Sequence, residues 1–437
     1  MQARTGNIPL QQVAVRRLPG RPWLFAASMA AAALTAVIAG LVLGILAALE
    51  TGYGSDRWSQ TVQAHGRIQL FGFAGVFISA LVFEFIIRMN GRRPFPWTVR
   101  LGVAAALGGG SLLQAAGTLW YDQVGWLAPI GGVLMAAGAI VFMVAVVRVK
   151  SPISLKLDPQ PWFIWLGAAW LTVAALMSVA SALNAVDGVG LPVETHAIAE
   201  VFVRGFVLQI IFAIGPRALR GHMGLPALTA RKQLILLFTL NVSTLAWLLA
   251  QDVWVLPGSA LVVRLADIGL AAGLLALTVW LRVFRNMRAR FKGEPYEWQV
   301  PIAWLGLTIY AATLVIVRLA DSPGNLNLYQ EGAIRHILFL GFMVPLMVAM
   351  SHVVLARFGT GVVHGERLLT AAFIILVAAW PLRVLPALGS DSPGDFGQGL
   401  MGLAGVATIV GLALVATVCV RTALAVSRPV QQVMRLG

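Results

Sequence analysis

The residues best suited to do chemistry are three histidines that occupy equivalent places in the chain. His65, His196 and His336, out of six histidines, each stand at the start of an apolar run that ends at arginines. A single membrane histidine is more often an interhelical hydrogen-bond partner, but the recurrence favours metal ligation, for which neutral imidazole is well suited. We therefore predict that His65 and His336 are the axial pair of a b-type haem. His196 is predicted as an alternative or additional metal ligand.

Two charged residues follow His196 at helical spacing. Glu200 and Arg204 come at successive intervals of four residues, so the three side chains share one face of a helix. In one interpretation Glu200 orients His196 as a hydrogen-bond acceptor and Arg204 neutralises the carboxylate. In the other, the three side chains pair only with one another and have a structural role. Both interpretations stay open.

Arginines within or beside the apolar runs are candidates for binding the carboxylates of a haem. Arg67, Arg264 and Arg335 are such residues, and the planar guanidinium fork binds a carboxylate through two hydrogen bonds. Arg264 has a second interpretation as the internal partner of Asp267, which follows it on the same helical face.

The composition is that of an integral membrane protein. Of 437 residues, 59% are hydrophobic and only 11% are charged, whereas soluble domains carry about a quarter charged residues. The single cysteine, Cys419, excludes a disulfide framework, a thiolate zinc site and an iron–sulfur cluster within one chain. Nearly the whole chain belongs to apolar runs, which leaves no room for a second, soluble domain.

We count about twelve apolar runs long enough to cross the hydrocarbon core of a bilayer. They lie at 23–49, 63–87, 99–120, 125–147, 162–184, 195–216, 232–251, 258–281, 300–320, 333–356, 368–389 and 399–425. Because lipid offers no partner to backbone polar groups, each run is predicted to be a helix. The predicted fold is all-α, with one transmembrane domain over 23–425, an N-terminal tail over 1–22 and a C-terminal tail over 426–437.

The distribution of charge predicts the orientation. Most Lys and Arg residues lie in the two tails and in every second loop, whereas the opposite loops are acidic. The positive-inside rule then places both termini in the cytoplasm and the three histidines near the outer surface. We interpret the net charge of +15 as topology signals and contacts with anionic lipid, not as a nucleic-acid surface. His352 lies far along the run that begins near His336, so the two belong to opposite faces.

This plan resembles the catalytic subunit of haem–copper oxidases, which has twelve helices and histidines at the outer ends of helices 2, 6 and 10. The chain departs from that pattern in two places. The run at 232–251 contains no histidine, and the run at 333–356 lacks a closely spaced pair beside His336. The chain therefore lacks the histidines that would bind copper and a second haem in such an oxidase. For this reason we do not predict that it reduces oxygen.

A closer resemblance is to the NnrS family of membrane proteins, which are linked to the response to nitric oxide. The segments that carry it are Gly20–Phe25, Ala64–Phe73, Gly215–Arg217, Trp280–Arg282, Pro301–Leu305 and Ala333–Gly341. The resemblance implies a bacterial inner-membrane protein that binds haem, with copper as a second candidate metal and nitric oxide as a candidate gas ligand. The family's helix 2 commonly carries two histidines and a glutamate, where this chain has only His65 followed by Gly66 and Arg67. No motif indicates catalytic turnover, so whether the protein is an enzyme stays open.

Two other classes of function compete with haem binding. A secondary transporter would use helices broken at mid-membrane, for which Pro345 and Pro381 are candidates. A non-catalytic partner could instead help to assemble a respiratory or nitric-oxide-reducing complex. The absorption spectrum of the purified protein separates these classes from a haem protein.

Overall fold

The computed structural model describes residues 23–49, 57–90, 94–149, 158–250, 259–285, 287, 291–320, 326–358, 363–388 and 393–435. Within these ranges the chain is helical, and its only β-type pairing is a single bridge between Val186 and Val189. The predicted tail over 1–22 lies outside the described residues. The predicted C-terminal tail is helical as far as Arg435.

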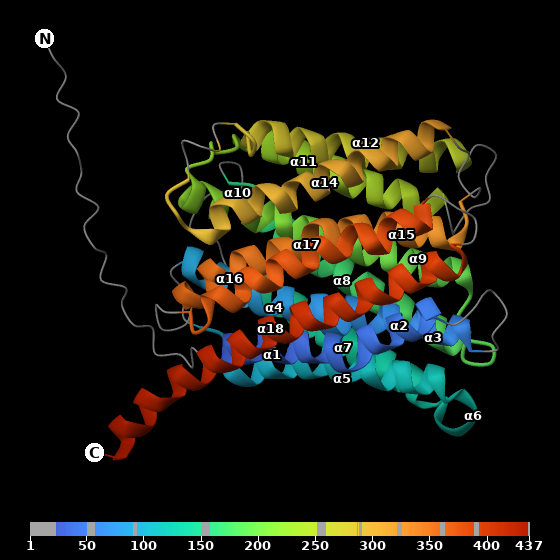
Figure 1. The fold of residues 1–437 in the computed structure, drawn as a ribbon, viewed down its shortest axis with the longest axis horizontal. Helices are drawn as coiled ribbons and strands as arrows, with labels where there is room; N and C mark the ends of the chain where they lie inside the picture. The colour runs from blue at the N-terminus through green and yellow to red at the C-terminus, as the bar shows by residue number, and fades with distance from the viewer. Residues whose placement is uncertain are drawn as a thin grey trace, which may run out of the picture.

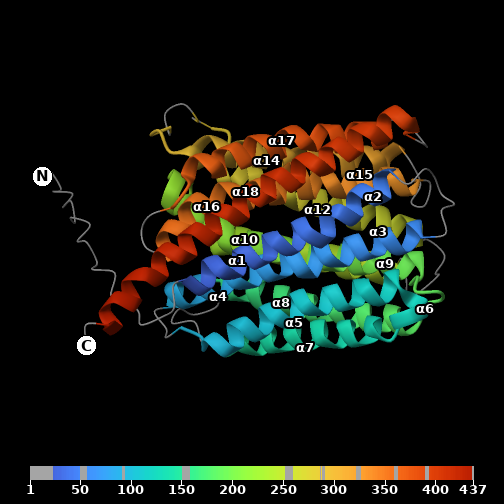
Figure 2. The same cartoon turned by 60° about the horizontal axis from the view of Figure 1, so that its bottom comes forward.

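The helices follow one another as an up-and-down bundle (Figures 1 and 2). Their bounds are α1 Trp23–Thr35, η1 Ala36–Leu41, α2 Val42–Leu49, α3 Trp58–Arg67, η2 Ile68–Gly75, α4 Val76–Asn90, α5 Trp97–Leu119, α6 Tyr121–Val124, α7 Leu127–Val147, α8 Gln160–Leu183, α9 Pro192–Glu200, η3 Val201–Val207, α10 Leu208–Met223, α11 Ala230–Leu248, α12 Ser259–Leu281, α14 Pro295–Ala320, α15 Leu328–Leu338, η5 Phe339–Met343, α16 Val344–Phe358, α17 Glu366–Leu388 and α18 Gly394–Arg435.

Eleven helices of the described chain are long and apolar enough to span a membrane, so this is a multi-pass membrane protein. Each of the twelve predicted runs coincides with a helix. The run at 232–251 corresponds to α11, which is not among the eleven and which begins with Arg231 and Lys232. α11 nevertheless packs along α12 and turns Phe238 outward, with 70% of that residue exposed.

Three long helices form the centre of the bundle, and each of them carries one of the three histidines. We call them the His65 helix (α3–η2–α4), the His196 helix (α9–η3–α10) and the His336 helix (α15–η5–α16). Their most apolar windows are 83%, 89% and 78% buried, whereas the other spans are between 33% and 50% buried. The outer helices therefore face lipid on one side and enclose the three histidine helices on the other.

Each of the three histidine helices widens into a π-helical segment shortly after its histidine. These segments are η2, η3 and η5, and each contains a glycine followed by phenylalanine: Gly72–Phe73, Gly205–Phe206 and Gly341–Phe342. π-helical turns shift the register of side chains and backbone carbonyls, and they occur frequently at functional sites. The sequence recurrence of the histidines is thus matched by a recurrence in backbone structure.

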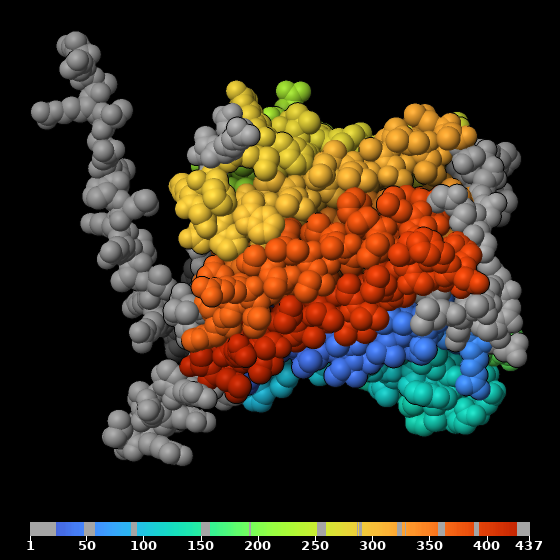
Figure 3. Space-filling view, viewed as in Figure 1, coloured from blue at the N-terminus to red at the C-terminus, as the bar shows by residue number. Residues whose placement is uncertain are grey.

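The two ends of the bundle differ. α1 starts and α18 finishes at one end, and α3, α9 and α15 start at the opposite end (Figure 1). Large apolar side chains point outward between the ends, among them Leu305, Ile316, Leu385 and Leu403 on α14, α17 and α18. Figure 3 shows α14, α17 and α18 covering one face. This outward apolar surface is what a bilayer requires.

The two prolines considered as helix breaks do not interrupt helices at mid-membrane. Pro381 lies inside α17, which continues from Glu366 to Leu388. Pro345 is the second residue of α16, immediately after η5. Both helices continue past their prolines, although each proline removes one backbone hydrogen bond.

Candidate functional site

A cavity of about 240 Å³ lies between the N-terminal parts of the His65 and His336 helices. His65 and His336 both line it, together with side chains of α2, α9, α17 and α18. Its polar lining consists of Gln63, His65, Arg67, Gln69, Thr195, Tyr329, Arg335, His336, Arg383 and Thr408. Most of the remaining lining is apolar, including Leu70, Phe73 and Phe339. The two histidines predicted as a pair therefore both lie in the lining of one cavity.

The orientation of His65 is set by the first transmembrane helix. Its Nδ1 lies 2.6 Å from the carbonyl oxygen of Gly40 in η1, so Nδ1–H donates to that carbonyl. Gly44 packs against the same ring, and a Cβ atom added there would lie 2.6 Å from Cε1 of His65. With the proton on Nδ1, the lone pair of Nε2 is available to a metal, which is the usual arrangement of a ligating histidine.

His336 is held in a similar way by its own helix. Its Nδ1 lies 2.6 Å from the carbonyl oxygen of Gly332, one turn earlier, and donates to it. A Cβ atom added at Gly332 would meet nothing within 4 Å, so the backbone beside this imidazole borders open space. His336 thus also keeps Nε2 for a ligand.

Two guanidinium groups at the cavity each have one buried nitrogen atom without a hydrogen-bond partner in the described chain. Arg67, which is 5% exposed, donates from Nη2 to Ser181 at 3.2 Å, but its Nη1 is unpartnered. Nη1 of Arg383 on α17 is likewise buried and unpartnered. Leaving such donors unsatisfied costs free energy, and a carboxylate is their natural partner. The site is therefore suited to an anionic group.

Arg383 was not among the arginines predicted from the sequence. It lies in an apolar helix that has no histidine, so nothing connected it with the cavity. The available signal was its position as a charged residue inside a membrane span, which is usually functional. It lines the cavity together with His65 and His336.

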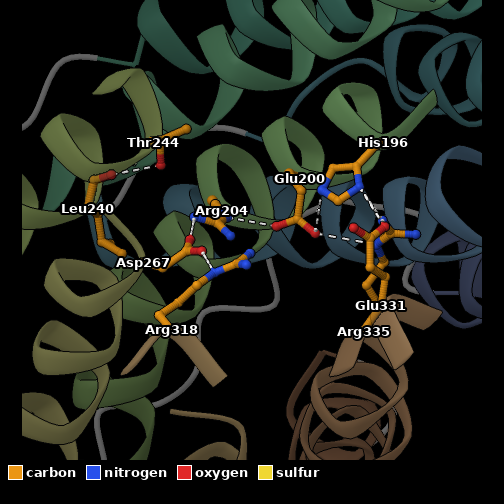
Figure 4. A network of polar contacts seen from close by, with 9 residues as sticks. All are labelled: His196, Glu200, Arg204, Leu240, Thr244, Asp267, Arg318, Glu331 and Arg335. Carbon is orange, nitrogen blue, oxygen red and sulfur yellow. Dashed lines mark hydrogen bonds and ion pairs between the residues drawn. The ribbon is translucent and has the colours of Figure 1, made fainter. Parts of the chain in front are cut away.

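His196 does not line the cavity; it belongs to a chain of ion pairs that runs between helices (Figure 4). Its Nδ1 lies 3.0 Å from Oε2 of Glu331 and 2.7 Å from Nη2 of Arg335, and its Nε2 lies 4.0 Å from Oε1 of Glu200. The ring also stacks on Trp247 of α11, with centroids 5.3 Å apart and planes at 16°. Charged side chains and an indole thus occupy the surroundings of this imidazole.

The chain of ion pairs continues into the bundle through Arg204. Its Nε donates to Glu200 at 2.7 Å and its Nη1 to Asp267 at 2.5 Å. Asp267, which is 0% exposed, also accepts from Nε of Arg318 at 2.5 Å. We call the connected residues the His196 network: His196, Glu200, Arg204, Asp267, Arg318, Glu331 and Arg335 (Figure 4).

Besides His196, the network contains three of the site residues that were predicted from the sequence, and it excludes a fourth, Arg264. Glu200 and Arg204 are joined as the helical spacing predicted, although as part of a larger network than a ladder on one helix. Arg335 donates to Glu200 and Glu331, both at 3.3 Å, and also lines the cavity. Arg264 is not among the residues that line the cavity, and Asp267 pairs with Arg204 and Arg318.

His352 lies apart from these groups, in the second half of the His336 helix. Its side chain is 2% exposed, and its Nδ1 is 3.7 Å from Oε1 of Glu366 at the start of α17. It does not line the cavity of His65 and His336. Across the described residues, no cluster of three or more His, Cys, Asp or Glu side chains could hold a metal ion by itself.

Comparisons with known proteins bear on the fold. A scan against protein-family models and a search of curated proteins both found no match. A solved haem–copper terminal oxidase dimer is similar in structure, with a TM-score of 0.69 over 92% of this chain and 84% of that chain. The two sequences are 13% identical. The chain has the fold of that oxidase chain, and the predicted fold class is confirmed.

Proposed function

We propose that this membrane protein binds one b-type haem in the cavity between the His65 and His336 helices, with His65 and His336 as axial ligands. The observation that carries the proposal is the pair of imidazoles on one cavity, each with Nδ1 committed to a backbone carbonyl and Nε2 available. The likeness to a haem–copper oxidase supports it as an analogy of fold.

The polar and apolar parts of the cavity suit the two parts of a haem. Arg67 and Arg383 offer unpartnered guanidinium nitrogens, and Arg335 adds a third positive charge to the lining. These arginines would hold the propionate carboxylates. Leu70, Phe73 and Phe339 would pack on the porphyrin and keep water from the axial positions.

A bound haem supplies one-electron redox chemistry or, when an axial position opens, a site for a diatomic gas. The residues of this chain favour the first role, because both axial histidines are fixed by hydrogen bonds to the backbone. Copper is not included in the proposal. Both ring nitrogens of His196, the remaining candidate ligand, face charged partners in the His196 network.

The proposed biological setting is the inner membrane of a bacterium, with both termini in the cytoplasm and the haem near the periplasmic face. The basic residues at the end where α1 starts support this orientation, among them Arg88, Arg100 and Arg282. By its resemblance to the NnrS family, the protein's role is in the response to nitric oxide and nitrosative stress.

Haem quantification of the purified full-length protein tests the proposal. A pyridine haemochrome assay is expected to give one b-type haem per chain. A result of two haems per chain would show that the protein has a second haem site. Colourless protein that folds and purifies normally would instead favour a transporter, and co-purification with an oxidase or reductase without pigment would favour an assembly partner.

A further inference from the structure

The His196 network forms part of one wall of the cavity. Arg335 belongs to both, since it contacts His196, Glu200 and Glu331 and also lines the cavity. The network contains three guanidinium groups, of Arg204, Arg318 and Arg335, and three carboxylates, of Glu200, Asp267 and Glu331. Its charges balance when His196 is neutral, so a proton on His196 would give the network a net positive charge.

The Nδ1 atom of His196 has two neighbours that require opposite states of that atom. Glu331 at 3.0 Å can only accept a hydrogen bond, which requires a proton on Nδ1. Nη2 of Arg335 at 2.7 Å can only donate, which requires a lone pair on Nδ1. One nitrogen cannot meet both requirements. The protonation of Nδ1 therefore decides whether Arg335 is bonded to His196 or released from it.

Protons can reach this imidazole from one side of the membrane. The side chains of His196 and Glu331 are 23% and 25% exposed. They lie near the start of α9 and α15, at the same end of the bundle (Figure 1). Arg204 and Asp267, deeper in the network, are 3% and 0% exposed at their side chains. His196 is thus a partly exposed member of the network at this end of the bundle.

The charged side chains that contact His196 in the described chain come from two helices. Glu200 lies on its own helix, and Glu331 and Arg335 lie on α15. The uncharged Trp247 of α11 covers the ring face, and α8, which packs on α9, carries no charged residue over Gln160–Leu183. α12, whose Val263 and Ala266 pack with Ala197, carries Arg264 and Asp267. An imidazolium would direct Nδ1 to Glu331 and Nε2 towards Glu200.

We propose that His196 binds a proton when the haem in the cavity is reduced, and that Arg335 carries the coupling between them. The inference rests on the proposed haem. One electron arrives from a one-electron donor, one proton arrives from the aqueous phase, and the proton adds to the lone pair of Nδ1. The hydrogen bond from Arg335 to His196 is lost, and His196 donates to Glu331. The negative charge gained in the cavity is offset by the imidazolium and by the freed guanidinium.

The test is the midpoint potential of the haem in full-length protein in nanodiscs, measured by spectroelectrochemical titration from about pH 5 to 8, where histidines titrate. One proton coupled to one electron lowers the potential by up to about 59 mV for each tenfold fall in proton concentration. We expect such a slope in the wild type and its loss in His196→Gln and His196→Asn, with the haem spectrum retained. His222→Gln, which changes a histidine in the last turn of α10, is the matched control and should keep the slope.

The outcomes separate the two proposals. A wild-type potential that does not change with pH overturns the inference, and so does an unchanged slope in the His196 variants; in both cases the haem itself stands. If the protein contains no haem, the proposed function and this inference both fail. If one His196 variant does not fold, the other carries the comparison, and a wild-type potential that does not change with pH overturns the inference without either variant.

Discussion

The imidazole of His65 donates from Nδ1 to the carbonyl of Gly40, 2.6 Å away, across the interface between the first and second spans of the chain. Gly40 lies in η1, a π-helical segment. This hydrogen bond fixes both the tautomer and the direction of the ring before any ligand binds. The matching hydrogen bond from His336 to Gly332 does the same for the second ring. The Nε2 lone pairs of both histidines are therefore available to a ligand in the cavity.

Gly44 is expected to tolerate no side chain. A Cβ atom at this position would lie 2.6 Å from Cε1 and 2.7 Å from Nδ1 of His65, so Gly44→Ala should displace the imidazole and lower haem occupancy several-fold. The absorbance ratio of haem to protein measures the effect. Gly102→Ala is the control, because a Cβ atom there meets nothing within 4 Å. Equal occupancy in the two variants would contradict the proposed role of His65.

His65→Ala and His336→Ala are each expected to abolish the spectrum of a haem with two histidine ligands. Each change removes one axial ligand from a cavity that offers no other histidine in its lining. The purified variants should be colourless or show a high-spin haem. His364→Ala, which changes an exposed histidine before α17, should resemble the wild type. Wild-type spectra in either cavity variant would show that the ligands lie elsewhere.

Arg67→Met and Arg383→Met test the arginines of the cavity. Each removes a guanidinium whose Nη1 is buried and unpartnered, so haem should be lost faster to an external acceptor such as apomyoglobin. A hydrogen bond to a charged group contributes about 1.5–3 kcal/mol, which corresponds to a rise of roughly tenfold or more in the rate of loss. Arg148→Met, at an exposed arginine, is the control. Unchanged rates in both cavity variants would argue against binding of carboxylates there.

Arg204→Met is expected to destabilise the bundle strongly. Arg204 compensates both Glu200 and Asp267 inside the protein, and removal of one partner from a buried ion pair costs about 3–5 kcal/mol. The Tm in detergent should fall accordingly. Arg88→Met should change stability by less than about 1 kcal/mol, because Arg88 lies at the surface and Glu84 keeps Arg100 as a partner. A double variant that also neutralises Glu200 should recover part of the loss.

The orientation can be tested by cysteine labelling. The natural Cys419 is buried and should not react in folded protein. Asn184→Cys, at the end of the bundle that holds the cavity, should react with an impermeant maleimide added to intact cells. His364→Cys, before α17, should react only after the membrane is permeabilised. The reverse pattern would place the cavity on the cytoplasmic side.

The helices could be predicted from the sequence because backbone polar groups in lipid must be satisfied within each run. Each of the twelve runs is helical, and the His65 and His336 helices begin earlier than their runs, at Trp58 and Leu328. Polar and charged residues in these first turns, such as Gln60 and Glu331, hid the true starts. The π-helical segments were missed as well, although the Gly–Phe pairs in η2, η3 and η5 are a signal that can be sought in the sequence.

The candidate site was only partly accessible to sequence reasoning. Recurrence connected His65 with His336, and the structure places both on one cavity. The same recurrence suggested a metal for His196, but partners from distant helices, Glu331, Arg335 and Trp247, determine the surroundings of that ring. Arg383 and Arg318 came from helices without histidines. Contacts between helices far apart in the chain leave no periodic pattern in a single sequence.

Electron paramagnetic resonance of the oxidised, purified protein tests the central claim most directly. If His65 and His336 bind one iron from opposite sides, the spectrum will show a low-spin ferric haem with two imidazole ligands, and this signal will disappear in His65→Ala and in His336→Ala. A haem signal that is high-spin in the wild type, or that is unchanged in both variants, would contradict axial ligation by this pair.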